Sequence, residues 1–239
     1  DACHMLKLAR NALAFLVAFC SSNDEKFERK FFEGLNLIQE QEGFKLSNKL
    51  WNNHIQFERH KMNVSLAAQA LSASVVDSMD FMNIALNLPE CRGSEVTVCF
   101  ARITDRLFDI LNSRNPHGQH FKKQLTLADL KGWQATLIST AKYLLSLRTC
   151  EGIPLIRHER KTFILGFVMT IKSTIIIMEM SKKCSQYLKI PSNMCWPTST
   201  HKIILSYFSH ASELKEAGTT IQIHSSSSIH FDECSLAML

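Results

Sequence analysis

The most regular hydrophobic pattern in the chain lies in residues 94–116. Its apolar side chains recur at spacings of three and four, as on the buried face of one helix: Val96, Phe100, Ile103, Leu107, Ile110 and Leu111. Ser94 stands where an N-cap would be, and Glu95 lies in the first turn, where the helix dipole favours an anion. Pro116 supplies a stop, since proline disfavours helical backbone in the residue before it. The pattern therefore predicts one buried helix in this segment.

A polar stripe runs along the same predicted helix. Asp105, Asp109 and Asn112 step by four and three residues, so their side chains share a face. Asp and Asn are poor helix-interior residues because their side chains compete for backbone hydrogen bonds. One interpretation is a solvated face that pairs with the arginines nearby on the helix. The other is a small polar site that accepts N–H donors from a ligand, and the pattern leaves both open.

Helical spacing recurs along most of the chain, and strand patterns are nearly absent. The other expected helices cover residues 1–19, 31–42, 46–57, 61–88, 127–148 and 161–183. The polar segment 21–29 is expected to be a linker, and the tail from Cys184 is expected to have low order because it has no sustained period. The fold class predicted from the residues is mainly α.

One of these helices has the composition of a membrane span. Residues 163–180 are largely apolar, but Lys172 lies in their middle, with Ser173 beside it. A charge at the centre of a bilayer costs about 2.5–3.5 kcal/mol on insertion scales. The favoured interpretation is a buried core helix, so no membrane is expected as a partner.

Charge and cysteine content exclude few functions. The formal charge of +5 and the pI of about 8.8 are compatible with nucleic-acid binding but do not indicate it. The eight cysteines are scattered singly, so a zinc site is not expected and reduced thiols are the default. Because the chain opens on Asp1 rather than Met, it is expected to be a fragment or the product of a truncated gene model.

Several runs of residues carry a resemblance to a known family. They are D-A-C-H-M-L-K-L-A-R-N at 1–11, the segments 46–55 and 61–72, D-R-L-F-D-I-L-N-S-R-N-P at 105–116, and R-K-T-F-I-L-G-F at 160–167. In this order they resemble the P-element transposases and their host-derived THAP-domain relatives. The first run is similar to the segment around the second catalytic aspartate of that family's RNase H-like domain. The others are similar to its GTP-binding insertion domain.

The resemblance implies a helical insertion that splits an RNase H-like nuclease. The implied parts are a remnant of the RNase H-like α/β domain in 1–20, a linker in 21–30, the GTP-binding insertion domain in 31–183, and a degenerate tail in 184–239. The residues that match the family's nucleotide-binding positions are Lys49, Val64, Ser72, Phe108, Asp109 and Asn112. A carboxylate such as Asp109 can accept two donors at once, which suits the N1–H and N2–H2 edge of guanine. The implied location is the nucleus, and the implied partners are GTP and, for the full-length parent, DNA.

Asp1 has two interpretations. It is an N-cap of the helix that follows, or, by the resemblance, a metal-binding catalytic acid at the end of a strand. The other acids of the family are not matched, because the first would lie upstream and the run that ends in the catalytic Glu is absent after 187–189. Mg²⁺ is therefore expected only in an intact parent, and this chain is expected to be inactive by itself in DNA cleavage and strand transfer.

Two departures from the family pattern leave an alternative function open. Asn63 stands where the family usually has a Lys, which removes a phosphate contact, and the absent C-terminal run also removes an Asp that reads guanine. The alternative is a domesticated helical protein-interaction module without nucleotide binding. A homo-oligomer is compatible with either function.

Overall fold

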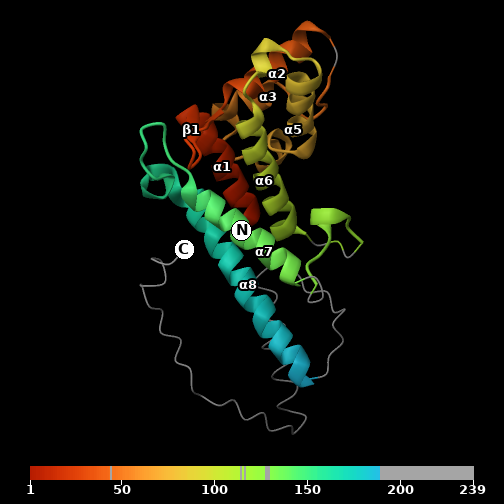
Figure 1. Ribbon diagram of the computed structural model, residues 1–239. Helices are drawn as coiled ribbons and strands as arrows, with labels where there is room; N and C mark the ends of the chain where they lie inside the picture. The colour runs from red at the N-terminus through yellow and green to blue at the C-terminus, as the bar shows by residue number, and fades with distance from the viewer. Residues whose placement is uncertain (44, 114, 116, 127–129, 189–239) are drawn as a thin grey trace.

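The computed structural model describes residues 1–43, 45–113, 115, 117–126 and 130–188 (Figure 1). Its longest helices are α1 (Ala2–Leu16), α6 (Glu95–Asn112), α7 (Leu130–Ser146) and α8 (Thr162–Leu188). The shorter helices are α2 (Lys30–Gln41), α3 (Asn52–Ile55), α4 (Val64–Ala70) and α5 (Ala73–Asp80). In these residues the strands β1 (Ala18–Cys20) and β2 (Lys26–Glu28) form an antiparallel pair. The prediction of a mainly α fold is therefore confirmed.

Helix α1 lies at the centre of this arrangement and contacts α4, α6 and α8. Its face with Leu6, Ala9 and Leu13 is buried, as its apolar spacing predicts. The Asp1 carboxylate accepts the backbone N–H of Cys3 at 3.0 Å, so Asp1 is the N-cap of α1. Helix α1 is thus part of the helical core. Within the described residues the only sheet is the β1–β2 pair, and a remnant of an RNase H-like domain in 1–20 is not confirmed.

The segment predicted to be a linker instead carries a strand of the sheet. β2 pairs with β1 in the register Phe19–Phe27, and both of these side chains are fully buried. Their rings lie 5.0 Å apart between centroids, and each lies within 5.4 Å of the Phe100 ring on α6. The strand is held by this aromatic packing, by its pairing with β1 and by the Glu28 N–H, which donates to the Thr97 hydroxyl of α6 at 3.0 Å, and polar composition could not reveal it.

The single helix predicted for 61–88 is wrong, because this range is divided into α4, α5 and a short π-helix, η2 (Phe81–Ala85), with a break between α4 and α5. α4 begins after Asn63, whose side chain accepts the backbone N–H of Leu66 at 3.1 Å. At Ser72 the backbone is extended, with φ −73° and ψ 155°, and α5 begins at Ala73. The Ser72 hydroxyl donates to the Gln69 carbonyl at 2.7 Å, a local bond that favours the end of a helix. The apolar stripe continues across the break, so periodicity alone could not show it.

Helix α6 agrees with its prediction. Phe100, Leu107, Ile110 and Leu111 are buried along one face, and the helix ends at Asn112. Ser94 occupies the N-cap position, but its hydroxyl makes no capping bond and is buried without a hydrogen-bond partner.

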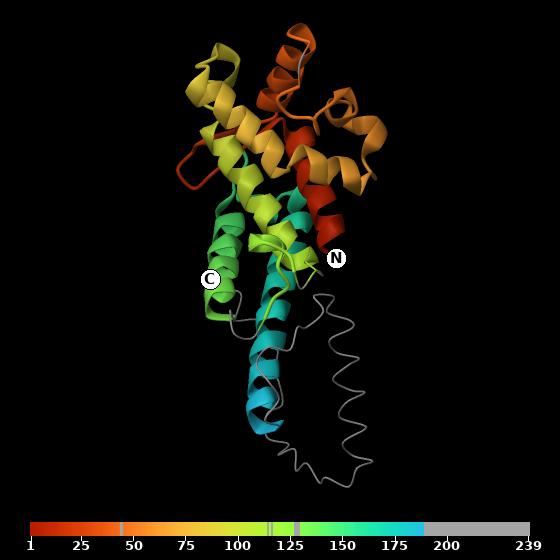
Figure 2. The same cartoon turned by 90° about the vertical axis from the view of Figure 1, so that its right-hand side faces the viewer.

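Helix α8 packs against α1 and α7, and in both views it continues beyond them (Figures 1 and 2). Phe163, Phe167 and Ile171 on this helix are fully buried or nearly so. The 24 residues Glu159–Lys182 are long and apolar enough to cross a membrane by length and composition, a property that core helices of soluble proteins share. Only 33% of the most apolar window of this segment is buried, so the expectation of a buried core helix stays a prediction.

The remaining predicted helices differ in extent. The helix predicted for 31–42 is present as α2, whereas 46–57 yields only α3 followed by the short helix η1 (Phe57–His60). The helix predicted for 127–148 is described from Leu130 as α7. In the range predicted to be a degenerate tail, α8 continues to Leu188, and 189–239 lie outside the described residues.

Candidate functional site

The polar stripe of α6 lies among three other parts of the chain. The backbone N–H of Ala73, the first residue of α5, hydrogen-bonds to the Asp105 carboxylate. The Lys122 ammonium lies 4.0 Å from the Asp109 carboxylate. The Asn112 side-chain oxygen accepts from the Cys3 thiol of α1 at 3.8 Å. The stripe therefore faces α5, α1 and the segment around Lys122 at once.

The arginines of α6 are engaged elsewhere. Arg102 pairs with Asp77 at 3.1 Å and with Asp80 at 2.6 Å, both on α5. The Arg106 guanidinium lies over the Phe121 ring, 5.2 Å from its centroid. Arg114 lies outside the described residues. Arg102 therefore pairs with carboxylates of α5 and not with the polar stripe, contrary to the interpretation of the stripe as an arginine-paired face.

The two carboxylates of the stripe are partly removed from water. The pKa of Asp105 is raised to about 6, mainly by burial and also by the neighbouring Asp109, against opposing effects of Lys122, the Ala73 N–H and Lys49. Burial also raises the pKa of Asp109, whose side chain is only 19% exposed, and Lys122 and Lys49 oppose that rise. A desolvated carboxylate with incomplete compensation gains from additional N–H donors, which a ligand can supply.

The structure brings together only part of the predicted nucleotide-binding set. Asp109 and Asn112 are half-buried neighbours on α6, and the positive charge of the exposed Lys49 acts on Asp109. Ser72 immediately precedes Ala73 at this site, but its hydroxyl is already bonded to the Gln69 carbonyl and to Ser74.

The other two members of the set lie differently. Phe108 is half-buried and packs against the hydrophobic core. Val64 is half-buried as the first residue of α4, which packs on α1. Neither residue has a polar contact that would place it at the Asp109 carboxylate, so their roles stay predictions.

Neither Asp105 nor Lys122 stands out in the sequence as a member of this site. Asp105 was part of the polar stripe, but the resemblance assigned it no role. Lys122 lies in a basic loop whose pairing with a carboxylate follows only from the tertiary fold. The available signal was the four-residue spacing between Asp105 and Asp109, which predicts a shared face but not its neighbours.

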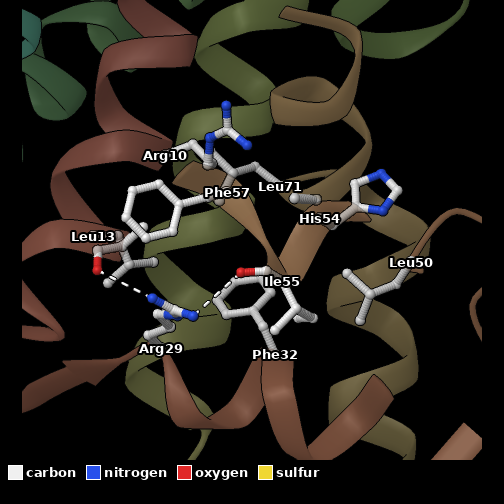
Figure 3. Close-up of a pocket in the computed structure, with 11 residues that line it drawn as sticks. Arg10, Leu13, Arg29, Phe32, Leu50, His54, Ile55, Phe57 and Leu71 are labelled. Atoms are coloured by element: carbon white, nitrogen blue, oxygen red, sulfur yellow. Dashed lines mark hydrogen bonds between the residues drawn. The ribbon is translucent and has the colours of Figure 1, made fainter. Parts of the chain in front are cut away.

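A separate cavity lies between α1, α2, α3 and α4 (Figure 3). It encloses about 390 Å³, including the solvent at its mouth, and its lining is mostly apolar, with Leu13, Phe32 and Phe57 among the contributors. The Arg29 guanidinium in this cavity donates to the Ala14 and Ile55 carbonyls. The Arg10 guanidinium points away from that of Arg29.

No metal site accompanies Asp1 in the described part of the chain. No group of three or more His, Cys, Asp or Glu side chains there is close enough to hold an ion. Asp1 itself is engaged in capping α1. A catalytic metal in the parent protein would need ligands from elsewhere.

Known proteins resemble this chain in both sequence and fold. Human DNA transposase THAP9 is 29% identical over 175 residues, which are 72% of this chain and 19% of that protein. The Drosophila P element transposase of a strand transfer complex has a TM-score of 0.61 at 20% identity, over 88% of this chain and 45% of that one, which shows a shared fold. This chain thus spans less than a fifth of the length of the human relative, 19%. A family model for the TNP-like, GTP-binding insertion domain matches residues 3–124, more than half of the chain, and the chain therefore belongs to this family of P-element-like transposases.

Proposed function

We propose that this chain is part of a P-element-like DNA transposase of the nucleus and that its helical domain binds GTP at the polar stripe of α6. The observation that carries the proposal is the pair of desolvated carboxylates, Asp105 and Asp109, inside the region that matches a GTP-binding family. The activity of the whole parent, including its action on DNA, is part of the same proposal.

In the proposed complex the guanine base contacts the end of α6. The Asp109 carboxylate accepts the N1–H and N2–H2 donors together, and Asn112 contributes an amide beside it. Lys49 and Lys122, whose charges already act on Asp109, offset the cost of its burial. Val64, Ser72 and Phe108 supply the walls of the site. The nucleotide positions DNA ends in the parent and is not hydrolysed to supply energy.

A calorimetric titration with GTP tests the proposed site. We expect saturable binding to the wild-type chain and binding weakened about 10- to 100-fold in Asp109→Ala, because a charge-assisted hydrogen bond contributes about 1.5–3 kcal/mol. The matched control is Asp77→Ala, which removes an exposed carboxylate on α5 while Arg102 keeps its bond to Asp80. Equal GTP affinities of Asp109→Ala and Asp77→Ala would show that Asp109 does not belong to the site.

We also propose that this chain does not cleave or join DNA by itself. Two-metal strand transfer needs several carboxylates around two ions about 3.5–4 Å apart. Within the described residues no such cluster exists. Incubation with a labelled terminal-repeat DNA and Mg²⁺ is expected to leave the DNA intact, and cleavage that EDTA abolishes would contradict this.

A second candidate function is a helical protein-interaction module without a nucleotide. Two observations favour it. The Asn63 side chain, at the position of the family's lysine, is used to cap α4. Apolar side chains on α8, Met169 and Ile176 among them, are more than half exposed. The absence of measurable binding in the GTP titration would support this candidate.

A further inference from the structure

Helix α1 carries two buried cations that the functions above do not use. Lys7 is 4% exposed and Arg10 is 5% exposed, and the two lie three residues apart on one face of the helix. Buried charges in proteins are normally paired with an opposite charge. Within the described residues neither Lys7 nor Arg10 forms an ion pair.

The present partners of these two cations are weak or incomplete. The Lys7 ammonium has the Met62 thioether as its partner at 3.6 Å, and a thioether sulfur is a poor acceptor. Arg10 donates through Nη2 to the His60 carbonyl at 2.9 Å, while its buried Nε and Nη1 have no partner. Burial lowers the pKa of Arg10 below its ordinary value, which reflects the cost of this uncompensated charge.

An anion that approaches Lys7 would have to displace the Met62 side chain. Met62 is 77% exposed, and its unbranched side chain can move off the Lys7 ammonium. The segment that faces the two cations, residues 59–61, reads Arg-His-Lys and adds positive charge. An anionic ligand would therefore supply what both side chains lack.

The position of the two cations connects them to the proposed guanine site. Cys3, Lys7 and Arg10 share one stripe of α1, and Cys3 at its start contacts Asn112. At 1.5 Å rise per residue, Lys7 lies about 6 Å and Arg10 about 10 Å along the helix from Cys3. Helix α1 lies beside α4 (Figure 2), and Lys7 on this stripe contacts Met62, two residues before α4 begins. A nucleotide whose base lies at Asn112 and whose phosphates extend along this stripe would reach Lys7 and Arg10.

We infer that Lys7 and Arg10 form the phosphate-binding part of the nucleotide site, with the triphosphate displacing the Met62 side chain. This inference rests on the proposed function, because it places the base at Asp109 and Asn112. It also provides a charged phosphate contact in place of the lysine that Asn63 replaces. Lys7 supplies a compact ammonium and Arg10 supplies the free N–H donors of its guanidinium.

Affinities for GTP and for guanosine separate the phosphate contacts from the base contacts. Lys7→Met and Arg10→Met are each expected to weaken GTP about tenfold or more, the loss of one charge-assisted contact, and to leave guanosine affinity unchanged. Lys142→Met, which removes an exposed cation of α7, is the control for net charge and is expected to change neither affinity. An unchanged ratio of GTP to guanosine affinity in both buried-cation variants would overturn the inference.

Two further readouts keep the test decisive. Without ligand, Lys7→Met is expected to melt at the same or a higher temperature than the wild type, because it removes an unpaired buried charge; a lower melting temperature would indicate a structural role. Inorganic tripolyphosphate is expected to raise the melting temperature of the wild type and of Lys142→Met but not of Lys7→Met.

The tripolyphosphate result also separates this inference from the proposed function. Stabilisation by tripolyphosphate that depends on Lys7, with no binding of guanosine, would support the phosphate site and contradict the guanine site. Stabilisation by a short DNA duplex but not by tripolyphosphate or GTP would assign the cations to the DNA backbone and overturn the nucleotide assignment. Should Lys7→Met fail to fold, Arg10→Met carries the same comparisons.

Discussion

Replacing Phe100 by alanine is expected to lower the free energy of unfolding by about 3–5 kcal/mol. Phe100 is fully buried, and its ring packs against Phe19 at 5.1 Å and Phe27 at 5.4 Å between centroids. Through this cluster α6 holds the β1–β2 pair, and Phe27 in turn lies 6.4 Å from the Tyr143 ring of α7. The loss is a large part of the stability of a typical domain, about 5–15 kcal/mol. Urea denaturation followed by circular dichroism measures it.

The control for this variant is Phe81→Ala. Phe81 begins the short π-helix η2 (Phe81–Ala85), and its side chain is 47% exposed. The expected loss there is below about 1 kcal/mol, since surface substitutions remove little packing. Equal losses in the two variants would show that the aromatic cluster does not hold α6 to the sheet.

The Asp105→Asn variant is expected to change how stability depends on pH. The pKa of Asp105 is raised to about 6 in the folded chain, mainly by burial, against about 3.9 in the unfolded chain. Because the folded state binds this proton more tightly, the Asp105 carboxyl does not destabilise the folded state below about pH 4. The free energy of unfolding falls as the pH rises from about 4 to about 6, by at most about 3 kcal/mol.

Asparagine at position 105 does not titrate, but its side-chain oxygen can still accept a hydrogen bond from the Ala73 N–H. The variant is therefore expected to match the wild type at about pH 4 and to exceed its stability above about pH 6, by as much as about 3 kcal/mol. Chemical denaturation of both proteins across this range gives the difference directly. Parallel pH profiles would mean that Asp105 is solvated in the folded chain.

The sequence predicted the helices whose apolar faces are long and uninterrupted. The stripe of large side chains in residues 94–116 predicted α6 because it fits one helix and no strand, although the helix ends at Asn112, four residues before Pro116. Prediction from the sequence failed where a single residue determines the local structure. Phe27 is the buried side chain of β2 in a polar segment, and the extended backbone of Ser72 breaks a stripe that continues on both sides.

The candidate site was predictable to a similar degree. The spacing of Asp109 and Asn112 placed both on one polar face, and the resemblance supplied a ligand for them. The partners of that face come from α1, from α5 and from the segment around Lys122, which no local pattern connects to α6. The burial of Lys7 and Arg10 was equally invisible, because cations in an amphipathic helix are ordinarily solvated.

A crystal structure of the chain with bound GTP tests the central claim most directly. We expect guanine N1 and N2 within hydrogen-bonding distance of the Asp109 carboxylate, Asn112 beside the base, and the triphosphate directed along α1 toward Lys7. Guanine bound elsewhere, with Asp109 still beside Lys122 and open to water, would contradict the account.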